Sequence, residues 1–304
     1  MPTTNLSSSD LTVRVGCAIS YETTQAVTLL VNLKPRIDPK QFIQQEKITL
    51  GEHLPCEEFE DTHGNIVYRL ILQPGHNEIR HDAIVLVPGV PDNHGLADLE
   101  PVPPGDLPTP LLRYTLPSRY CDSDKLFDFA WQHFGHVPHG RQRVQAICDW
   151  IHKNIEYRFG AGRPDISAWD VIQQGFGVCR DFAHTAIALC RTFNLPARYV
   201  TGHLPDIGYI DPGSPMDFHA YFEVYLGGRW FTYDARFNVP RIGRIKIACG
   251  RDAIEGAFST IYGAALLSHF EVWAYQIEPG TVSVGDPIDL SKRLDGTLEV
   301  KGAA

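Results

Sequence analysis

Long apolar runs, clusters of basic residues and closely paired cysteines are all missing from this sequence of 304 residues. No apolar run approaches the roughly 20 residues that a helix needs to span a bilayer. The first 24 residues also lack the basic and apolar regions of a signal peptide. The seven cysteines are odd in number and show no CxxC spacing, so neither a disulfide framework nor a zinc knuckle is predicted. We therefore expect a cytoplasmic protein with no membrane partner.

The charge balance excludes a further class of partner. With 27 basic and 36 acidic residues the net charge is -9, and the sequence carries no positive patch that would attract a phosphate backbone. Nucleic acid is therefore not an expected partner. Hydrophobic residues at 43 % and charged residues at 21 % are typical of a packed globular chain, and the length allows two domains.

The first part of the chain is rich in short β-type segments. Alternating or β-branched runs occupy residues 12–21, 26–33, 66–72 and 84–87, with Gly, Pro and Asn between them. This pattern predicts an antiparallel β-sandwich domain over residues 1–90. Eight prolines between positions 88 and 117 exclude a helix interior or a central strand there, so residues 91–125 are predicted to be a Pro-rich linker.

The second part combines helices and strands. Apolar residues recur with helical spacing over residues 126–134 and 141–155, and a third helix is expected over 179–193. Residues 198–202, 218–226, 229–234 and 270–277 are rich in strand-forming residues. The fold class is therefore α+β, with a second domain over 126–294 and a fraying tail over 295–304.

Cys179 stands where a nucleophilic thiol belongs. Gly175 and Gly177 precede it, and the helical pattern begins at the cysteine itself. A helix N-terminus stabilises a thiolate through its unpaired N–H groups and the helix dipole. The alternative is structural, because Cys179, Ala183, Ala186 and Cys190 lie on one helix face and would form a buried stripe. We assign that structural role to Cys190.

A Gly227-Gly228 turn places a histidine beside an aspartate. Two β-rich runs flank the glycines, as in a hairpin with a tight turn. If Leu226 faces Arg229, paired positions sum to 455, so Tyr221 faces Asp234 and His219 faces Arg236. His219 and Asp234 are then diagonal neighbours on one sheet face. The carboxylate would orient the imidazole, whose other nitrogen would face a thiol; otherwise the two are an incidental polar pair.

The motifs taken together resemble the bacterial transglutaminase-like proteins of the papain-like cysteine enzyme superfamily. The similarity rests on GVCRDFA at residues 177–183, LPARYVTG at 195–202, His219 in a strand, and residues 230–234. It covers about residues 140–280, and the β-rich first part resembles the N-terminal domain that these bacterial proteins often carry. The resemblance implies a papain-like core in which Cys179 is the nucleophile, His219 the base and Asp234 the orienting acid.

The function that follows is thiol-dependent acyl transfer from an amide or peptide bond, with hydrolysis by a cysteine peptidase or amidase as the main expectation. Val178 departs from the glutamine typical of animal transglutaminases, so amine transfer is the alternative. A catalytically silent peptide-binding module and an arylamine acetyltransferase also stay open. The expected partner is a peptide or protein amide, with no cofactor and no metal.

Other candidate residues have simpler interpretations. The spacing of His133, His136 and His139 could gather a metal, but glycines and a proline interrupt the helix, so a histidine-rich loop is favoured. Arg198 is expected to hold a carboxylate or carbonyls rather than a substrate. Tyr157 and Trp169 are expected to be core aromatics, although they could line the acyl site. The other charged candidates are expected in solvated loop pairs: Arg241, Arg244, Arg251 and Asp252.

Overall fold

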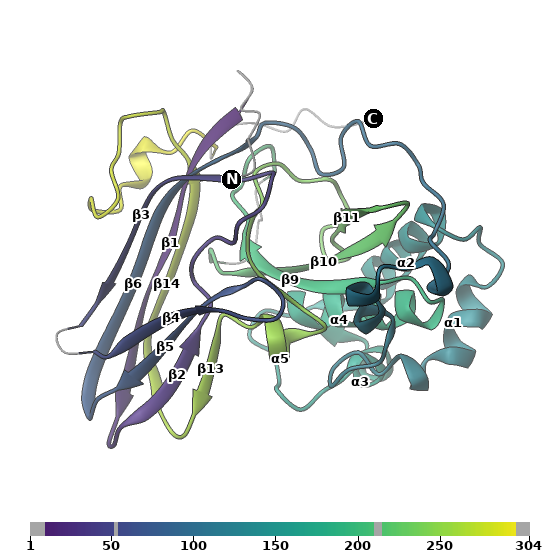
Figure 1. Cartoon of the computed structure of the whole chain (residues 1–304), viewed down its shortest axis with the longest axis horizontal. Coiled ribbons are helices and arrows are strands. Elements are labelled where there is room, and N and C mark those ends of the chain that lie inside the picture. Colours follow the sequence, from purple (N-terminus) through teal and green to yellow (C-terminus); the bar gives the residue numbers. More distant parts are fainter. Residues whose placement is uncertain (1–9, 52–53, 210–214, 296–304) are drawn as a thin grey trace.

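The structure, a computed structural model, describes residues 10–51, 54–209 and 215–295. Two four-stranded antiparallel sheets form a sandwich on one side of the molecule (Figure 1). One sheet has the strand order β14 (Leu266–Gln276), β1 (Asp10–Thr23), β6 (Gly75–Pro88) and β3 (Phe42–Leu50). The other has the order β13 (Ser259–Tyr262), β2 (Val27–Val31), β5 (Ile66–Leu72) and β4 (Cys56–Glu60). The predicted antiparallel sandwich is thus present.

The sandwich is completed by strands from the end of the chain, contrary to the predicted boundaries. β14 pairs with β1 along most of its length, with Cys17 opposite Val272, and β13 pairs with β2. The assignment of the strand at 270–277 to the second domain is therefore wrong. After β6 the chain leaves the sandwich and forms the second part. It then returns as β13 and β14, which pair with the edges of β2 and β1 that would otherwise be open.

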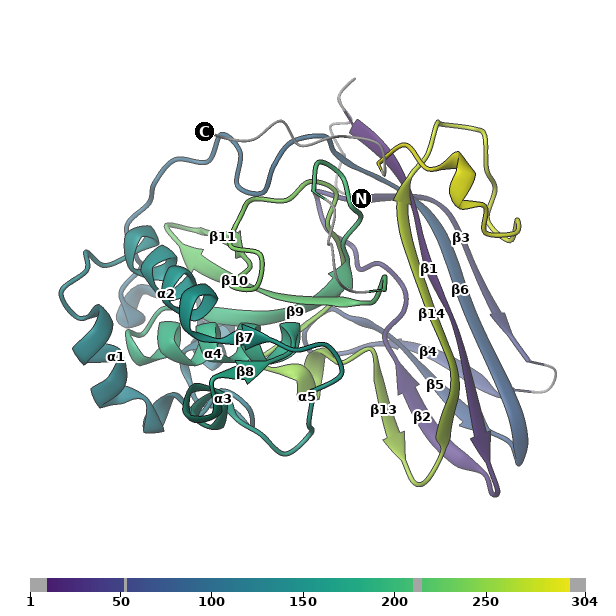
Figure 2. The same ribbon diagram turned by 180° about the vertical axis from the view of Figure 1, so that it is seen from behind.

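The second part is a four-stranded antiparallel sheet covered by helices, most of which lie on the side away from the sandwich (Figures 1 and 2). Its strand order is β11 (Arg229–Tyr233), β10 (His219–Leu226), β9 (Ala197–His203) and β12 (Ile245–Gly250). The helices are α1 (Phe127–Phe134), α2 (Arg141–Asn154), α3 (Ala168–Gln174), α4 (Cys179–Thr192) and α5 (Ala253–Gly256). β7 (Glu156–Tyr157) and β8 (Phe176–Gly177) form a short parallel pair beside α4. This confirms the α+β, papain-like fold class.

The Pro-rich segment is not a free linker, although its only regular elements are 3-10 helices at Pro104–Asp106, Thr109–Thr115 and Ser123–Lys125. The Asn93 side chain donates to the Thr232 carbonyl and accepts from the Thr232 N–H, so it caps the open edge of β11. A Cβ on Gly227, whose φ is +51°, would lie 2.5 Å from Leu99. The segment is therefore packed against the hairpin.

The two parts share apolar packing. Phe218, Ile247 and Ala248 of the second part lie in one buried cluster with sandwich residues such as Leu29 and Leu70. Across the described residues, no helix has the length and apolar character needed to cross a membrane.

The end of the described chain is anchored. Asp295 is buried and pairs with Arg293, so fraying does not begin at 295 as expected. The rest of the predicted tail, 296–304, lies outside the described residues.

Candidate active site

α4 begins at Cys179, as the sequence predicts, and the glycines before it have distinct roles. Gly175 ends α3 in the left-handed conformation with φ of +73°. A Cβ on Gly177 would lie 2.8 Å from the Asp181 Cβ. That close approach lets the Asp181 carboxylate accept the Val178 N–H at 3.0 Å and close the first turn. Cys179 is partly exposed at the head of this helix, while Cys190 is fully buried.

The hairpin register is confirmed from Leu226 to Phe222, but the ladder ends before the predicted pairs of Tyr221 with Asp234 and of His219 with Arg236, because residues 235–237 form a turn. Leu226 faces Arg229 and Phe222 faces Tyr233, so the paired positions sum to 455 along the ladder. Gly227 and Gly228 both have positive φ, as a tight primed turn requires. β11 ends one residue before Asp234, and His219 Nε2 lies 2.7 Å from Asp234 Oδ2. The diagonal contact between the two side chains is therefore present.

Cys179 and His219 meet at one cleft. Both line the same two hollows, and the backbone N–H of Ala220, the residue after His219, donates to the Cys179 sulfur. Because Asp234 occupies Nε2 of the imidazole, Nδ1 is the nitrogen left for proton exchange with the thiol. The three residues selected from the sequence thus come together from α4, β10 and the end of β11.

The resting charges differ from the expected thiolate. Burial raises the pKa of the Cys179 thiol to about 11, against the opposing effects of the Ala220 N–H and Arg236. Burial also lowers the pKa of His219, and this outweighs the neighbouring Asp234 carboxylate. Both shifts favour an uncharged thiol beside an uncharged imidazole at neutral pH, because desolvation of Cys179 outweighs the Ala220 N–H and Arg236.

Asp234 is held by four donors. Its Oδ1 accepts the backbone N–H groups of Arg236 and Phe237 at 3.1 and 3.3 Å. Its Oδ2 accepts from His219 and, at 2.9 Å, from Arg244 Nη2. Burial opposes ionisation of Asp234, but His219 and Arg244 together place the pKa of this carboxyl well below its usual value. The carboxylate therefore stays charged and fixed in direction.

Arg244 and Asp92 support the site, although the sequence suggested only a solvated loop pair for Arg244 and no role for Asp92. The Arg244 side chain is 5 % exposed and its Nε donates to Asp92 of the Pro-rich segment at 2.7 Å. The expectation of solvated loop pairs is wrong for Arg241, Arg244 and Asp252, which are largely buried, whereas Arg251 does form an exposed pair with Glu255. No local signal marks this ion chain, since Asp92 lies 152 residues from Arg244.

The other candidates have structural partners. Arg198 binds the buried Glu223 carboxylate at 2.8 Å, as predicted. Trp169 packs against the main core, while Tyr157 lies under Arg236 and lines the cleft. His133 bonds to the Phe129 carbonyl and His139 to Arg143. No metal-binding group of three or more His, Cys, Asp or Glu side chains occurs among the described residues.

The two hollows that share Cys179 and His219 differ in character. The first, which we call the arginine hollow, has a volume of about 300 Å³ and is lined by Arg236, Arg241 and Arg293 together with Tyr157, Phe159 and Asp206. The second, the α5 hollow, has a volume of about 490 Å³; Ile254, Ala257 and Phe258 line it together with Arg180, Asp217 and Thr201. Cys179 and His219 thus line both an arginine-rich depression and a more apolar one.

The neutral resting pair predicts a particular pH dependence of thiol reactivity. Only the thiolate attacks iodoacetamide, so the alkylation rate of Cys179 should rise about tenfold per pH unit between pH 6 and 9. The measurement is peptide mapping after limited alkylation in a Cys56→Ser background, because Cys56 is the exposed competing thiol. A rate that stays level across this range would show a preformed thiolate and contradict the prediction.

Comparisons with known proteins agree with this geometry. The family model described as the transglutaminase-like superfamily matches residues 131–235, a span that includes Cys179, His219 and Asp234. A crystal structure of a candidate cysteine protease from Cytophaga hutchinsonii is 34 % identical, with a TM-score of 0.80 over 91 % of this chain and 94 % of that chain. An uncharacterized protein, ML0607, of Mycobacterium leprae is 31 % identical over 120 residues, which span 38 % of this chain and 43 % of that relative.

Proposed function

The chain belongs to the transglutaminase-like superfamily, and we propose that it hydrolyses an amide or peptide bond through a thioester on Cys179. The observation that carries the proposal is the placement of Cys179 at the head of α4, in one cleft with a histidine whose far nitrogen is held by Asp234. The substrate in this proposal is a peptide or protein amide, and we place the reaction in the cytoplasm.

The first half of the reaction forms the thioester. His219 Nδ1 takes the proton of the Cys179 thiol as the sulfur attacks the carbonyl carbon of the substrate. The oxyanion that forms can accept the backbone N–H of Cys179, which lies in the first turn of α4 and has no partner within the helix. When the C–N bond breaks, the imidazolium returns its proton to the leaving amine.

The second half releases the acyl group. A water molecule gives a proton to His219 Nδ1 and attacks the thioester carbonyl, and the carboxylic acid leaves as the proton returns to the sulfur. Throughout, the Asp234 carboxylate keeps the imidazole in one tautomer and stabilises its cationic form, while Arg244 and two backbone N–H groups keep the carboxylate in place.

Hydrolysis is favoured over amine transfer for two reasons. Val178 stands where animal transglutaminases typically have glutamine, and the Cytophaga hutchinsonii relative is described as a candidate cysteine protease. Water at ~55 M captures a thioester unless a site holds the amine in attack geometry, an effect worth several kcal/mol. Amine transfer stays the second candidate, since the same thioester serves both reactions.

Partitioning of the thioester between water and an added amine tests the proposal. Once a turned-over peptide amide is found with a fluorogenic panel, cadaverine is titrated against it and both products are quantified by mass spectrometry. We expect mostly free acid even at millimolar amine. Amide product that dominates and saturates with cadaverine would instead establish an amine site and overturn hydrolysis. If no amide is turned over in a Cys179-dependent manner, the chain is a peptide-binding module.

A further inference from the structure

The α5 hollow offers apolar surface beside the nucleophile and little usable charge. Of its two charged side chains, Arg180 donates to the Arg163 carbonyl and pairs with Asp181, while Asp217 accepts the Phe218 N–H and keeps its negative charge. The arginine hollow, on the other side of Cys179 and His219, has three guanidinium groups in its wall. A substrate side chain in the α5 hollow therefore meets fewer cationic groups than one in the arginine hollow.

Two large apolar side chains form the outer wall of the α5 hollow. Ile254 on α5 is 59 % exposed, which leaves most of its surface available for contact with a ligand. Phe258, in the segment that leads into β13, stacks on Phe218 with a centroid distance of 5.1 Å. Because Phe218 directly precedes His219, this wall is tied to the catalytic strand. Neither Ile254 nor Phe258 lies within the family match at 131–235.

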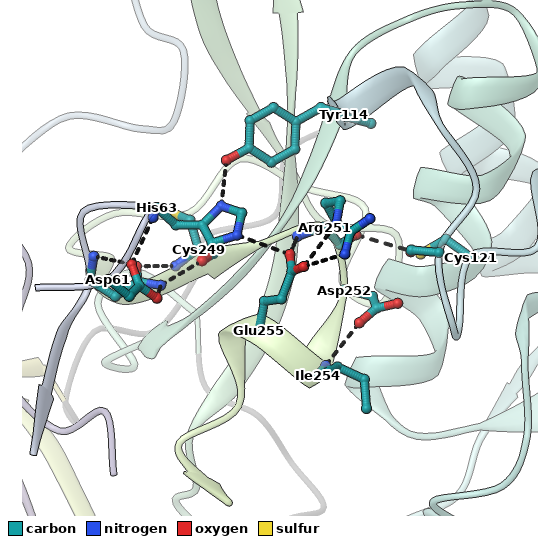
Figure 3. A network of polar contacts seen from close by, with 12 residues as sticks. Asp61, His63, Tyr114, Cys121, Cys249, Arg251, Asp252, Ile254 and Glu255 are labelled. Atoms are coloured by element: carbon teal, nitrogen blue, oxygen red, sulfur yellow. Dashed lines mark hydrogen bonds and ion pairs between the residues drawn. The ribbon is translucent and has the colours of Figure 1, made fainter. Parts of the chain in front are cut away.

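A polar network holds α5 in position from behind (Figure 3). The Asp252 carboxylate accepts the Ile254 N–H at 2.8 Å and the Tyr120 N–H at 3.0 Å. Glu255 pairs with Arg251 and with His63 Nε2 at 3.0 Å. His63 comes from the turn between β4 and β5 of the sandwich. The wall is therefore fixed before any substrate arrives, and a preformed wall binds without the entropic cost of ordering it.

We propose that the α5 hollow is a specificity pocket for a bulky apolar side chain, such as leucine or phenylalanine, on the residue next to the scissile amide. The inference rests on the proposed function and adds the substrate class. Covering Ile254 and Phe258 removes apolar surface from water, whereas an acidic side chain would lose its hydration beside the Asp217 carboxylate. The transglutaminase-like core supplies the chemistry, and the returning segment at 253–260 selects the substrate.

Unbiased cleavage profiling followed by matched variants tests this pocket. A peptide mixture is digested by the full-length protein, with Cys179→Ala as the blank, and cleavage sites are read by mass spectrometry. Two quenched peptides that differ only by Leu or Gly at the selected position then give a ratio of kcat/KM values. We expect Ile254→Asp and Phe258→Ala to lower this Leu/Gly ratio about tenfold or more. Phe127→Ala, at an exposed aromatic on α1 that lines neither hollow, should leave it unchanged.

The outcomes separate the pocket from the chemistry. Cys179-dependent cleavage without an apolar preference, or an unchanged ratio in Ile254→Asp, overturns the specificity pocket and leaves the proposed function intact. If Phe258→Ala fails to fold, the result for Ile254→Asp settles the question, because Ile254 is largely exposed. Absence of any Cys179-dependent cleavage would remove the proposed function, and the pocket assignment with it.

Discussion

Replacing Cys179 with alanine is expected to abolish turnover while leaving the fold intact. The Cys179 side chain is small and partly exposed at the first residue of α4, and alanine is a strong helix former. The substitution should therefore change the free energy of unfolding only slightly. The chemistry has no substitute nucleophile, and loss of the nucleophile in a serine protease lowers kcat on the order of 10⁶-fold. Steady-state assays with the best peptide amide, together with thermal unfolding, measure both effects.

Cys190→Ala is the matched control on the same helix. Cys190 is fully buried in the core, so its truncation should lower the melting temperature and leave kcat per folded molecule near that of the wild type. Appreciable hydrolysis by the Cys179→Ala variant would show that the acyl group is not carried on this sulfur.

Asp234→Asn is expected to lower kcat by about 10⁴-fold without unfolding the protein, the loss seen when the triad acid of a serine protease is changed in this way. Oδ2 of Asp234 accepts from both His219 and Arg244. An amide NH₂ at that position would face the Arg244 donor, and an amide oxygen there would lack the charge that stabilises the imidazolium. The measurement is kcat over pH 5 to 9 together with a circular dichroism spectrum.

Tyr221→Phe serves as the control for Asp234→Asn. The Tyr221 ring lies near both His219 and Arg244, with its centroid 6.2 Å from the imidazole centroid and 4.6 Å from the guanidinium carbon. Its buried hydroxyl has no hydrogen-bond partner among the described residues. Removal of that hydroxyl should change kcat far less than Asp234→Asn does. If the Asp234→Asn variant folds and turns over normally, Asp234 does not orient the histidine.

The sequence alone was sufficient where the determinants are local. The helix from Cys179 follows from apolar spacing after two glycines, and the His219–Asp234 contact follows from counting outward from Gly227-Gly228. Both inferences use residues within about 15 positions of each other, where backbone geometry sets which side chains meet. β3 and β4 were not predicted because their residues are largely exposed and lack an apolar alternation.

Tertiary structure decided the features that depend on distant segments. The return of β14 to β1, the Asp92–Arg244 pair behind the acid, and the uncharged state of Cys179 arise from packing between residues far apart in the chain. The spacing of apolar residues in the sequence indicates only which side chains are buried. The pKa of a side chain depends on the groups that surround it in space. The sequence therefore determined the helix at Cys179 and the contact of His219 with Asp234, and the fold determined the direction of their pKa shifts, their supporting ions and the walls of the cleft.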